Sequence, residues 1–204
     1  MSINIAIIAV STLVSVCCFK RPQWFYRLAF VPVYNDRANA YRWFSYGLVH
    51  ADWGHLLVNM FVLWCFGAMV EDAYRYMWND RGMLLYLLLY VTALPISTYA
   101  DGLRYKADSS YVAVGASGAV SAVVFASILL FPLKKFYIMF VPIGIPAVLF
   151  GIMYLLYEVY MDKKANDHVG HKTHVWGAIY GFIFALIFRP RLLVAFVVQI
   201  LQVF

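Results

Sequence analysis

Long runs of apolar residues, separated by short polar connectors, constrain this chain more than any other feature of its sequence. Several runs are about 17 to 25 residues long, the length of helix that crosses the hydrocarbon core of a bilayer. Of the 204 residues, 64% are hydrophobic and 13% are charged, whereas soluble domains are roughly half apolar and a quarter charged. A soluble fold of this size could not bury so much apolar surface, so the sequence predicts an integral, multi-pass membrane protein.

Six membrane-spanning helices are expected in a single domain that covers residues 1–204. A bilayer admits only helices and closed barrels, and apolar runs of this length without alternating polar residues favour helices. The predicted fold class is therefore all-α, a polytopic membrane helix bundle. Residues 20–54 should form a folded first loop at the interface, and residues 189–204 an apolar tail. The expected spans are Ile3–Phe19, His55–Val70, Met83–Tyr99, Tyr111–Leu133, Phe136–Tyr160 and Thr173–Phe188.

The positive charge of the chain points to lipids as partners. The formal net charge is +6, which in a soluble protein would suggest nucleic acid. Here the basic residues lie in short connectors between apolar runs, so lipid headgroups are the expected partners and nucleic acid is not. Cys17, Cys18 and Cys65 all lie in apolar runs and are read as small packing residues. The first run lacks a basic leading region and a small-residue cleavage site, which indicates a retained span.

Polar side chains inside spans are costly and are therefore candidates for function. The second span contains His55 and Asn59, the fourth contains Ser117, and the sixth begins near His174. Consecutive spans alternate in direction, so spans two, four and six run the same way. We expect Ser117 about six residues into its helix, roughly 9 Å deep at 1.5 Å per residue. These four side chains should therefore meet at one face of the membrane, at similar shallow depth.

A serine and a histidine that meet in this way form a nucleophile and its general base. His55 and Asn59 are four residues apart, on one helical face, and can donate to the same developing oxyanion. The expected cores contain almost no acid, since Glu71 and Glu158 fall at span ends. The sequence therefore predicts a Ser–His dyad rather than a triad. No cofactor and no metal ion is expected.

Small residues at helical spacing should bring the fourth and sixth spans close together. Such stripes allow helix backbones to approach closely in a membrane. The stripe on the fourth span contains Gly115, Gly118, Ala122 and Ala126. The stripe on the sixth contains Gly177, Gly181 and Ala185.

Each of these features also has a purely structural interpretation. Serine in a span rich in glycine and alanine commonly packs, and Gly-x-x-x-Gly beside a histidine is mostly ordinary helix packing. His55 and Asn59 could form an interhelical hydrogen bond. His168, His171 and His174, spaced three apart, could bind a metal, although the first two lie in a polar connector. The convergence of all the candidates on one face favours catalysis.

This set of motifs resembles the rhomboid proteases. That family has Gly-x-Ser-Gly in its fourth helix, His-x-x-Gly-x-x-x-Gly in its sixth, His-x-x-x-Asn in its second, and an aromatic-Arg pair in its first loop. It also commonly carries an acidic residue at the end of the second helix. The corresponding segments here are Gly115-Ala116-Ser117-Gly118, His174-Val-Trp-Gly177-Ala-Ile-Tyr-Gly181, His55-Leu-Leu-Val-Asn59, Tyr41-Arg42 and Glu71.

The resemblance implies an intramembrane serine endopeptidase of multi-pass type, in the inner membrane if the protein is bacterial. Ser117 would be the nucleophile and His174 the base, with His55, Asn59 and the Ser117 backbone N–H lining the oxyanion hole. The substrates would be transmembrane segments of other proteins, entering sideways and unwinding at Ser117. The residues implied to support the site are Gly115, Gly118, Gly177, Gly181, Arg42 and Glu71.

One departure from the family concerns the catalytic histidine. Many bacterial members carry a tyrosine four residues after the nucleophile, and its ring packs on the histidine; this chain has Ser121 there. Trp176 or Tyr180 is expected to replace that ring. Two other functions stay open at this point. One is a catalytically inactive rhomboid-like protein that binds transmembrane segments, and the other is a small transporter or metal-binding channel built on the histidines.

The fifth span should be the most loosely packed wall of the bundle. An interior proline kinks a helix and glycine adds backbone freedom. We therefore expect the segment Phe136–Tyr160 to move aside when a substrate helix enters; a permanently kinked, static helix is the alternative. The residues on which this expectation rests are Pro142, Gly144, Pro146 and Gly151.

Overall fold

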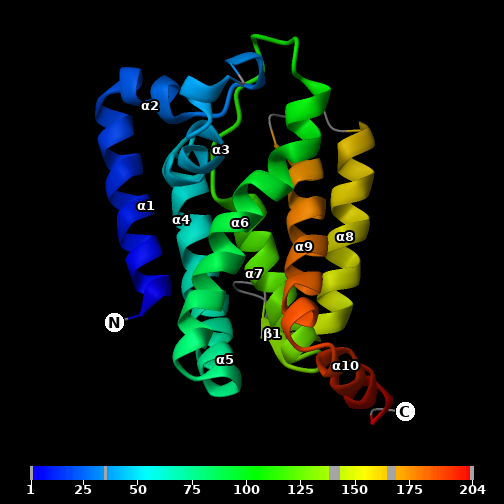
Figure 1. Cartoon of the computed structure of the whole chain (residues 1–204). Coiled ribbons are helices and arrows are strands. Elements are labelled where there is room, and N and C mark those ends of the chain that lie inside the picture. The colour runs from blue at the N-terminus through cyan, green and yellow to red at the C-terminus, as the bar shows by residue number, and fades with distance from the viewer. Residues whose placement is uncertain (1, 35, 138–142, 165–168, 203–204) are drawn as a thin grey trace.

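The computed structural model describes residues 2–34, 36–137, 143–164 and 169–202. Most of this chain is helical, and the long helices stand side by side as a bundle (Figure 1). The helices are α1 (Ile3–Lys20), α2 (Pro22–Leu28), α3 (Arg42–Ser45), α4 (Trp53–Val62), α5 (Ala68–Trp78), α6 (Asp80–Arg104), α7 (Ser117–Leu130), α8 (Ala147–Lys164), α9 (His171–Phe188) and α10 (Arg191–Leu201). Short 3₁₀ turns at Pro32–Tyr34, Arg37–Asn39 and Tyr46–Leu48 shape the first loop.

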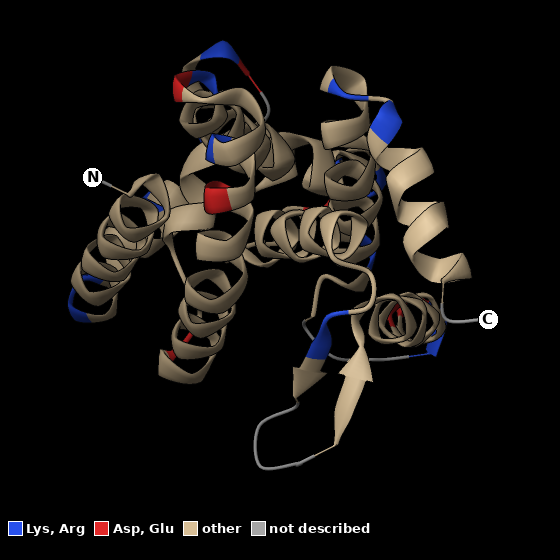
Figure 2. Ribbon diagram, turned by 90° about the horizontal axis from the view of Figure 1, so that it is seen from below, with Lys and Arg blue, Asp and Glu red and all other residues tan. Residues whose placement is uncertain are grey.

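Several helices are apolar enough to cross a membrane, as the composition predicts. Among the described residues, three helical segments are long and apolar enough on their own: α1, the continuous rod Trp53–Trp78, and α6. The last two helices, α9 and α10, pass the same test together but are bent by 115°, and α7 is apolar but shorter. Figure 2 shows that most of the ribbon carries neither basic nor acidic residues. The chain is a multi-pass membrane protein, and the count of six spans remains an expectation.

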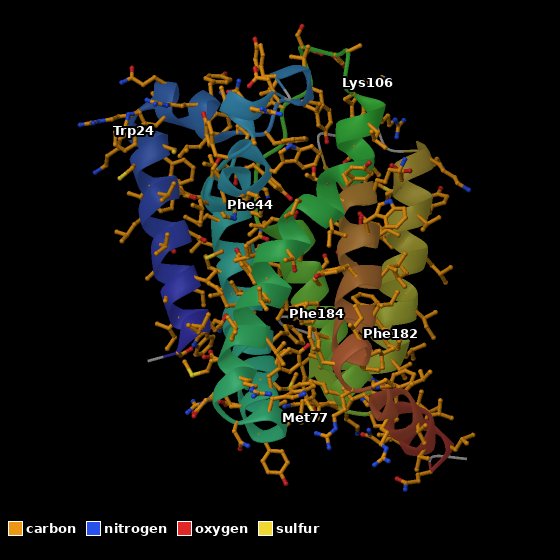
Figure 3. All side chains as sticks on the ribbon, in the orientation of Figure 1. Trp24, Phe44, Met77, Lys106, Phe182 and Phe184 are labelled. Carbon is orange, nitrogen blue, oxygen red and sulfur yellow. The ribbon has the colours of Figure 1, made fainter. Side chains whose placement is uncertain are left out.

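The second and third spans are longer than the apolar runs that predict them. A π-helical stretch at Leu63–Gly67 joins α4 to α5 without a break, so the helix extends well beyond Val70. Glu71 is buried but continues the helix, because its carboxylate accepts hydrogen bonds from Ser2 and Ile3. Asp72 and Arg75 after it are exposed. Figure 3 places Met77 at that end, and Trp24 and Lys106 at the opposite end, with the first loop.

The fourth span begins six residues later than predicted, because Tyr111–Ala116 is not helical. The segment runs from the end of the bundle into its interior before α7 starts at Ser117 (Figure 1). Ala113 forms an antiparallel bridge with Phe30 of the first loop. Gly115 donates its N–H to the Tyr46 carbonyl over 3.0 Å and has a φ of 112°, which disfavours any residue with a Cβ. Backbone hydrogen bonds to the first loop thus replace the predicted helical turns.

The fifth span was also predicted wrongly at its start. Residues Lys135–Tyr137 (β1) and Gly144–Pro146 (β2) form an antiparallel hairpin, and α8 begins directly after it at Ala147. Proline lacks the N–H that a helix interior requires, so Pro146 lies before the helix and does not kink it. Of the residues expected to loosen this span, only Gly151 lies within α8, and Pro142 lies outside the described residues.

The centre of the bundle is α7, in which every residue from Gly118 to Leu129 is buried. Glycine permits its contact with α9. A Cβ on Gly177 would collide with the Gly118 carbonyl oxygen, and one on Gly181 would collide with that of Ala122. The two small-residue stripes therefore face each other, as expected. By contrast, α8 buries only three residues of its 18: Ala147, Gly151 and Glu158.

Candidate active site

Ser117 and His174 lie at the starts of the two most closely packed helices. Ser117 is the first residue of α7, and His174 lies in the first turn of α9. Their side chains meet, with 2.8 Å between His174 Nε2 and Ser117 Oγ. This is the distance of a hydrogen bond between a hydroxyl and an imidazole acceptor. The backbone N–H groups at the start of a helix have no partner within it, so the Ser117 N–H is a donor beside its own hydroxyl.

A chain of hydrogen bonds fixes the loop before Ser117. The Ala116 N–H donates to Nε2 of His50 over 3.5 Å, and His50 Nδ1 lies 2.9 Å from the hydroxyl of Ser15. That hydroxyl donates to the Leu48 carbonyl over 2.9 Å. The arrangement requires a neutral imidazole with its proton on Nδ1. Burial lowers the pKa of His50, which lies in the connector before α4, to about 3. From the sequence, His50 was expected to support the loop and not to catalyse, and its hydrogen bonds agree with that role.

His55 and Asn59 both lie on α4 beside this loop. The His55 ring packs against Gly115 so closely that a side chain at Gly115 would collide with it. The Asn59 side chain is buried one turn further along, and its Nδ2 donates to the His55 carbonyl oxygen over 2.9 Å. The amide has a second N–H to offer. His55 is therefore next to the serine loop, while Asn59 makes its one described hydrogen bond within its own helix.

An acidic residue lies at the site, contrary to the expectation of a dyad without any carboxylate nearby. Glu158 of α8 is buried, with 4% exposure. Its Oε1 is 3.1 Å from His174 Nδ1, and its Oε2 is 2.6 Å from His171 Nδ1. The first distance is that of an ion pair, although the carboxylate oxygen lies too far from the N–H direction for a regular hydrogen bond. The direction of the spans could have revealed this residue, because the C-terminal end of span five reaches the same face as the starts of spans four and six.

Neither Trp176 nor Tyr180 replaces the ring expected on His174. The Tyr180 hydroxyl lies 2.6 Å from that of Thr92 on α6. Trp176 is 44% exposed and lines an apolar groove of about 400 Å³ with Trp43 and Tyr99. The ring found beside His174 is that of His171, with 6.3 Å between centroids in an edge-on arrangement.

Ser121, which stands where the family tyrosine was expected, is bonded to a tyrosine from another helix. Its hydroxyl lies 2.7 Å from that of Tyr154 on α8. A tyrosine hydroxyl is therefore present beside Ser121, but it comes from α8, where Tyr154 lies four residues before Glu158.

Arg42 fixes the first loop, and Glu71 attaches α1 to α5. The Arg42 guanidinium donates to the carbonyls of Tyr26 and Ala29 over 2.8 and 2.7 Å, and so fixes the first loop. The buried Glu71 accepts from the Ser2 hydroxyl over 2.6 Å and from the Ile3 N–H over 2.8 Å. A carboxylate at a helix N-terminus is favourable, so Glu71 anchors α1.

Three potential metal ligands converge beside the serine: Glu158, His171 and His174. They differ from the three histidines considered from sequence, because His168 lies outside the described residues. In the structure, the Nδ1 atoms of His171 and His174 already lie 2.6 and 3.1 Å from the Glu158 carboxylate. A cation at this point would have to displace those contacts.

A family model of the rhomboid domain matches residues 37–191 of this chain. The chain belongs to the rhomboid family. It is also similar to RHOMBOID-like protein 12, mitochondrial, of Arabidopsis thaliana, with 27% identity over 137 residues, which are 63% of this chain and 40% of the relative. This rhomboid thus spans about two fifths of the length of the curated relative it matches.

Proposed function

We propose that this rhomboid is an intramembrane serine endopeptidase that cleaves transmembrane segments of other proteins. The observation that carries the proposal is the 2.8 Å separation of Ser117 Oγ and His174 Nε2 at adjoining helix starts. A nucleophile within hydrogen-bond reach of a base is the arrangement that acyl transfer requires. A structural serine in a helix commonly bonds to a backbone carbonyl one turn back, as Ser127 does with Val124.

The proposed reaction has two halves. The Ser117 oxygen attacks the scissile carbonyl while His174 Nε2 takes the hydroxyl proton. The resulting oxyanion is stabilised by the Ser117 N–H, by the His55 ring and by the free N–H of the Asn59 amide. His174 then gives its proton to the leaving amine. A water molecule, deprotonated by His174, then attacks the acyl-enzyme, and His174 returns that proton to Ser117 Oγ as the second product leaves.

The place of the site supports a substrate that is itself a membrane segment. The chain segment before α7 runs into a bundle of apolar helices (Figure 1). The scissile bond of a substrate would therefore meet Ser117, the first residue of α7, inside that bundle. We infer six spans, with α7 and α8 completing those recognised by length and hydropathy, and lipids around them. For a bacterial chain, the location would be the inner membrane.

Covalent labelling tests the function directly. A fluorophosphonate probe should label the purified protein in detergent or bicelles, and the chain should cleave a model transmembrane substrate. Both activities should disappear in Ser117→Ala and in His174→Ala, with unfolding transitions retained. Ser127→Ala, which removes a buried hydroxyl from the same helix, serves as the matched control and should keep both. Cleavage by purified Ser117→Ala would rule out the mechanism, and a folded wild type that neither labels nor cleaves would favour an inactive binding protein.

A further inference from the structure

Glu158 has no part in the reaction outlined above, yet its carboxylate lies against the base. It is contributed by α8, which contacts α9 in the bundle (Figure 1). Both of its oxygens are occupied by histidines of α9: Oε1 by His174 at 3.1 Å and Oε2 by His171 at 2.6 Å. The carboxylate and both imidazoles are nearly enclosed, with side-chain exposures of 6% for Glu158, 5% for His171 and 14% for His174.

We propose that Glu158 is a positioning residue that orients His174 and stabilises its protonated form, so that the working unit is Ser117–His174–Glu158. This inference rests on the proposed proteolytic function. The fifth span thereby takes a direct part in the chemistry through Glu158, a residue that lies outside the motifs of Ser117 and His174.

The first argument concerns the ring orientation of His174. For Nε2 to accept the Ser117 proton, the ring proton must sit on Nδ1. In the structure, Nδ1 is buried and lies 3.1 Å from the carboxylate Oε1. Any other tautomer would turn a lone pair toward a negative oxygen, so the carboxylate selects the tautomer that the reaction needs.

The second argument concerns charge. When His174 takes the serine proton it becomes an imidazolium in a poorly solvated place, which is costly without a counter-charge. A carboxylate 3.1 Å away supplies that counter-charge, and it is already in place before the proton moves. Preorganised groups aimed at developing charge are among the largest contributions to catalysis.

His171 makes the arrangement possible. A single buried carboxylate would need other partners to remain ionised. The 2.6 Å contact from His171 Nδ1 provides one, and it holds the carboxylate so that the second oxygen faces His174. A purely structural interpretation, in which Glu158 only attaches α8 to α9, predicts the same contacts. The two interpretations differ in their effect on the chemical step.

The test compares Glu158→Gln with wild type in single-turnover cleavage and in fluorophosphonate labelling, across pH 5 to 9. We expect kcat to fall by about 10- to 1,000-fold, less than the roughly 10⁴ that a fully engaged triad carboxylate can supply, with KM changed by less than about 3-fold. The acid limb of the profile should move to lower pH, because a neutral amide no longer favours the protonated imidazole. Glu158→Asp, which keeps the charge, should restore the acid limb and part of the rate.

Glu71→Gln is the matched control, since Glu71 is also buried, at 2% exposure, but contacts α1 instead of His174. Its folded fraction should keep the wild-type kcat and acid limb. If Glu158→Gln folds and shows wild-type kcat and pH profile, the inference is overturned. If Glu158→Gln does not fold, Glu158→Asp decides: a kcat below that of the wild type with an unchanged KM supports a positioning role, and a wild-type kcat contradicts it. A wild type that neither cleaves nor labels would instead overturn the proposed function.

Discussion

At the residue scale, the packing of His55 beside the serine loop depends on one glycine, Gly115. The ring lies against Gly115, whose φ of 112° and lack of a side chain let the serine loop pass beside it. Asn59 follows on the same face of α4, with one amide N–H bonded to the His55 carbonyl over 2.9 Å and one left to donate. Together with the Ser117 N–H they are the donors of the proposed oxyanion hole, so removing one would leave the others.

We therefore expect His55→Ala and Asn59→Ala to weaken cleavage without abolishing it. Losing one oxyanion donor typically costs about 10²- to 10³-fold in rate, and the other donors remain. The measurement is kcat on a transmembrane substrate, alongside labelling of Ser117 as a check on the nucleophile. Wild-type rates in both single variants would show that the oxyanion is stabilised by other groups.

A second prediction concerns His50 and the way in which the stability of the fold depends on pH. Its neutral ring accepts from the Ala116 N–H and contacts Ser15, and burial lowers its pKa to about 3, with the nearby His55 lowering it further and Asp52 opposing the shift. An unfolded chain would protonate this histidine near pH 6.5. Stability from His50 is thus fully present above about pH 6.5 and is lost as the pH falls toward 3, by at most about 1.4 kcal/mol per pH unit.

Reversible unfolding of the purified protein in mixed micelles, measured between pH 7.5 and 4.5, checks this expectation. In His50→Gln, whose amide cannot take up the proton, the overall stability should be lower but its decline with acid should be shallower. An unchanged slope in that variant would assign the acid sensitivity to other groups.

At the scale of helices, the most demanding contact is the one between α7 and α9. A Cβ at Gly181 would collide with the Ala122 carbonyl oxygen, and backbone cannot move aside as a flexible side chain can. Gly181→Ala should therefore separate the two helices, destabilise the fold by about 1–3 kcal/mol and reduce cleavage by moving His174 from Ser117.

Gly170→Ala provides the comparison, because the nearest atoms to its Cβ would be those of Thr173, at 3.5 Å. Gly170→Ala should show the same unfolding transition and the same rate of cleavage as the wild type. Equal stability of Gly181→Ala and wild type, measured by the same unfolding assay, would mean that the helices can adjust to the extra methyl group.

An element could be predicted from sequence where the residues within it determine it, and not where distant residues do. Apolar length predicts that helices exist, and small residues predict which of them approach closely. The start of α7 could not be predicted, because residues 111–116 are held out of the helix by hydrogen bonds to the first loop, as between Gly115 and Tyr46. The hairpin before α8 was missed because its apolar residues read as a continuation of the span. Glu158 was counted as a span end, although the alternating direction of spans already placed it at the site.

At the scale of the whole molecule, the proposed function requires a route by which a substrate helix reaches Ser117. The serine helix is enclosed, with Gly118 to Leu129 all buried. The helix α8 is an outer wall that buries only Ala147, Gly151 and Glu158, and large apolar side chains such as Leu156 and Tyr157 are exposed along it. The proline kink expected from sequence does not loosen it, but α8 buries fewer residues than α6, α7 or α9, so its displacement into lipid should break fewer packing contacts.

The last prediction follows from this arrangement: α8 moves aside to admit a substrate helix and returns to bring Glu158 back to His174. Native Cys17, Cys18 and Cys65 are first replaced, and single cysteines are then placed at Tyr157 of α8 and at Val58, which is 61% exposed on α4. A bifunctional maleimide joining them should block cleavage of a transmembrane substrate, because the wall can no longer open. Labelling of Ser117 by a small fluorophosphonate should continue, since the closed form keeps the site intact. Each single-cysteine variant treated with the same reagent serves as the control. If the crosslink is complete by mass and cleavage is not slowed, substrates enter past another helix.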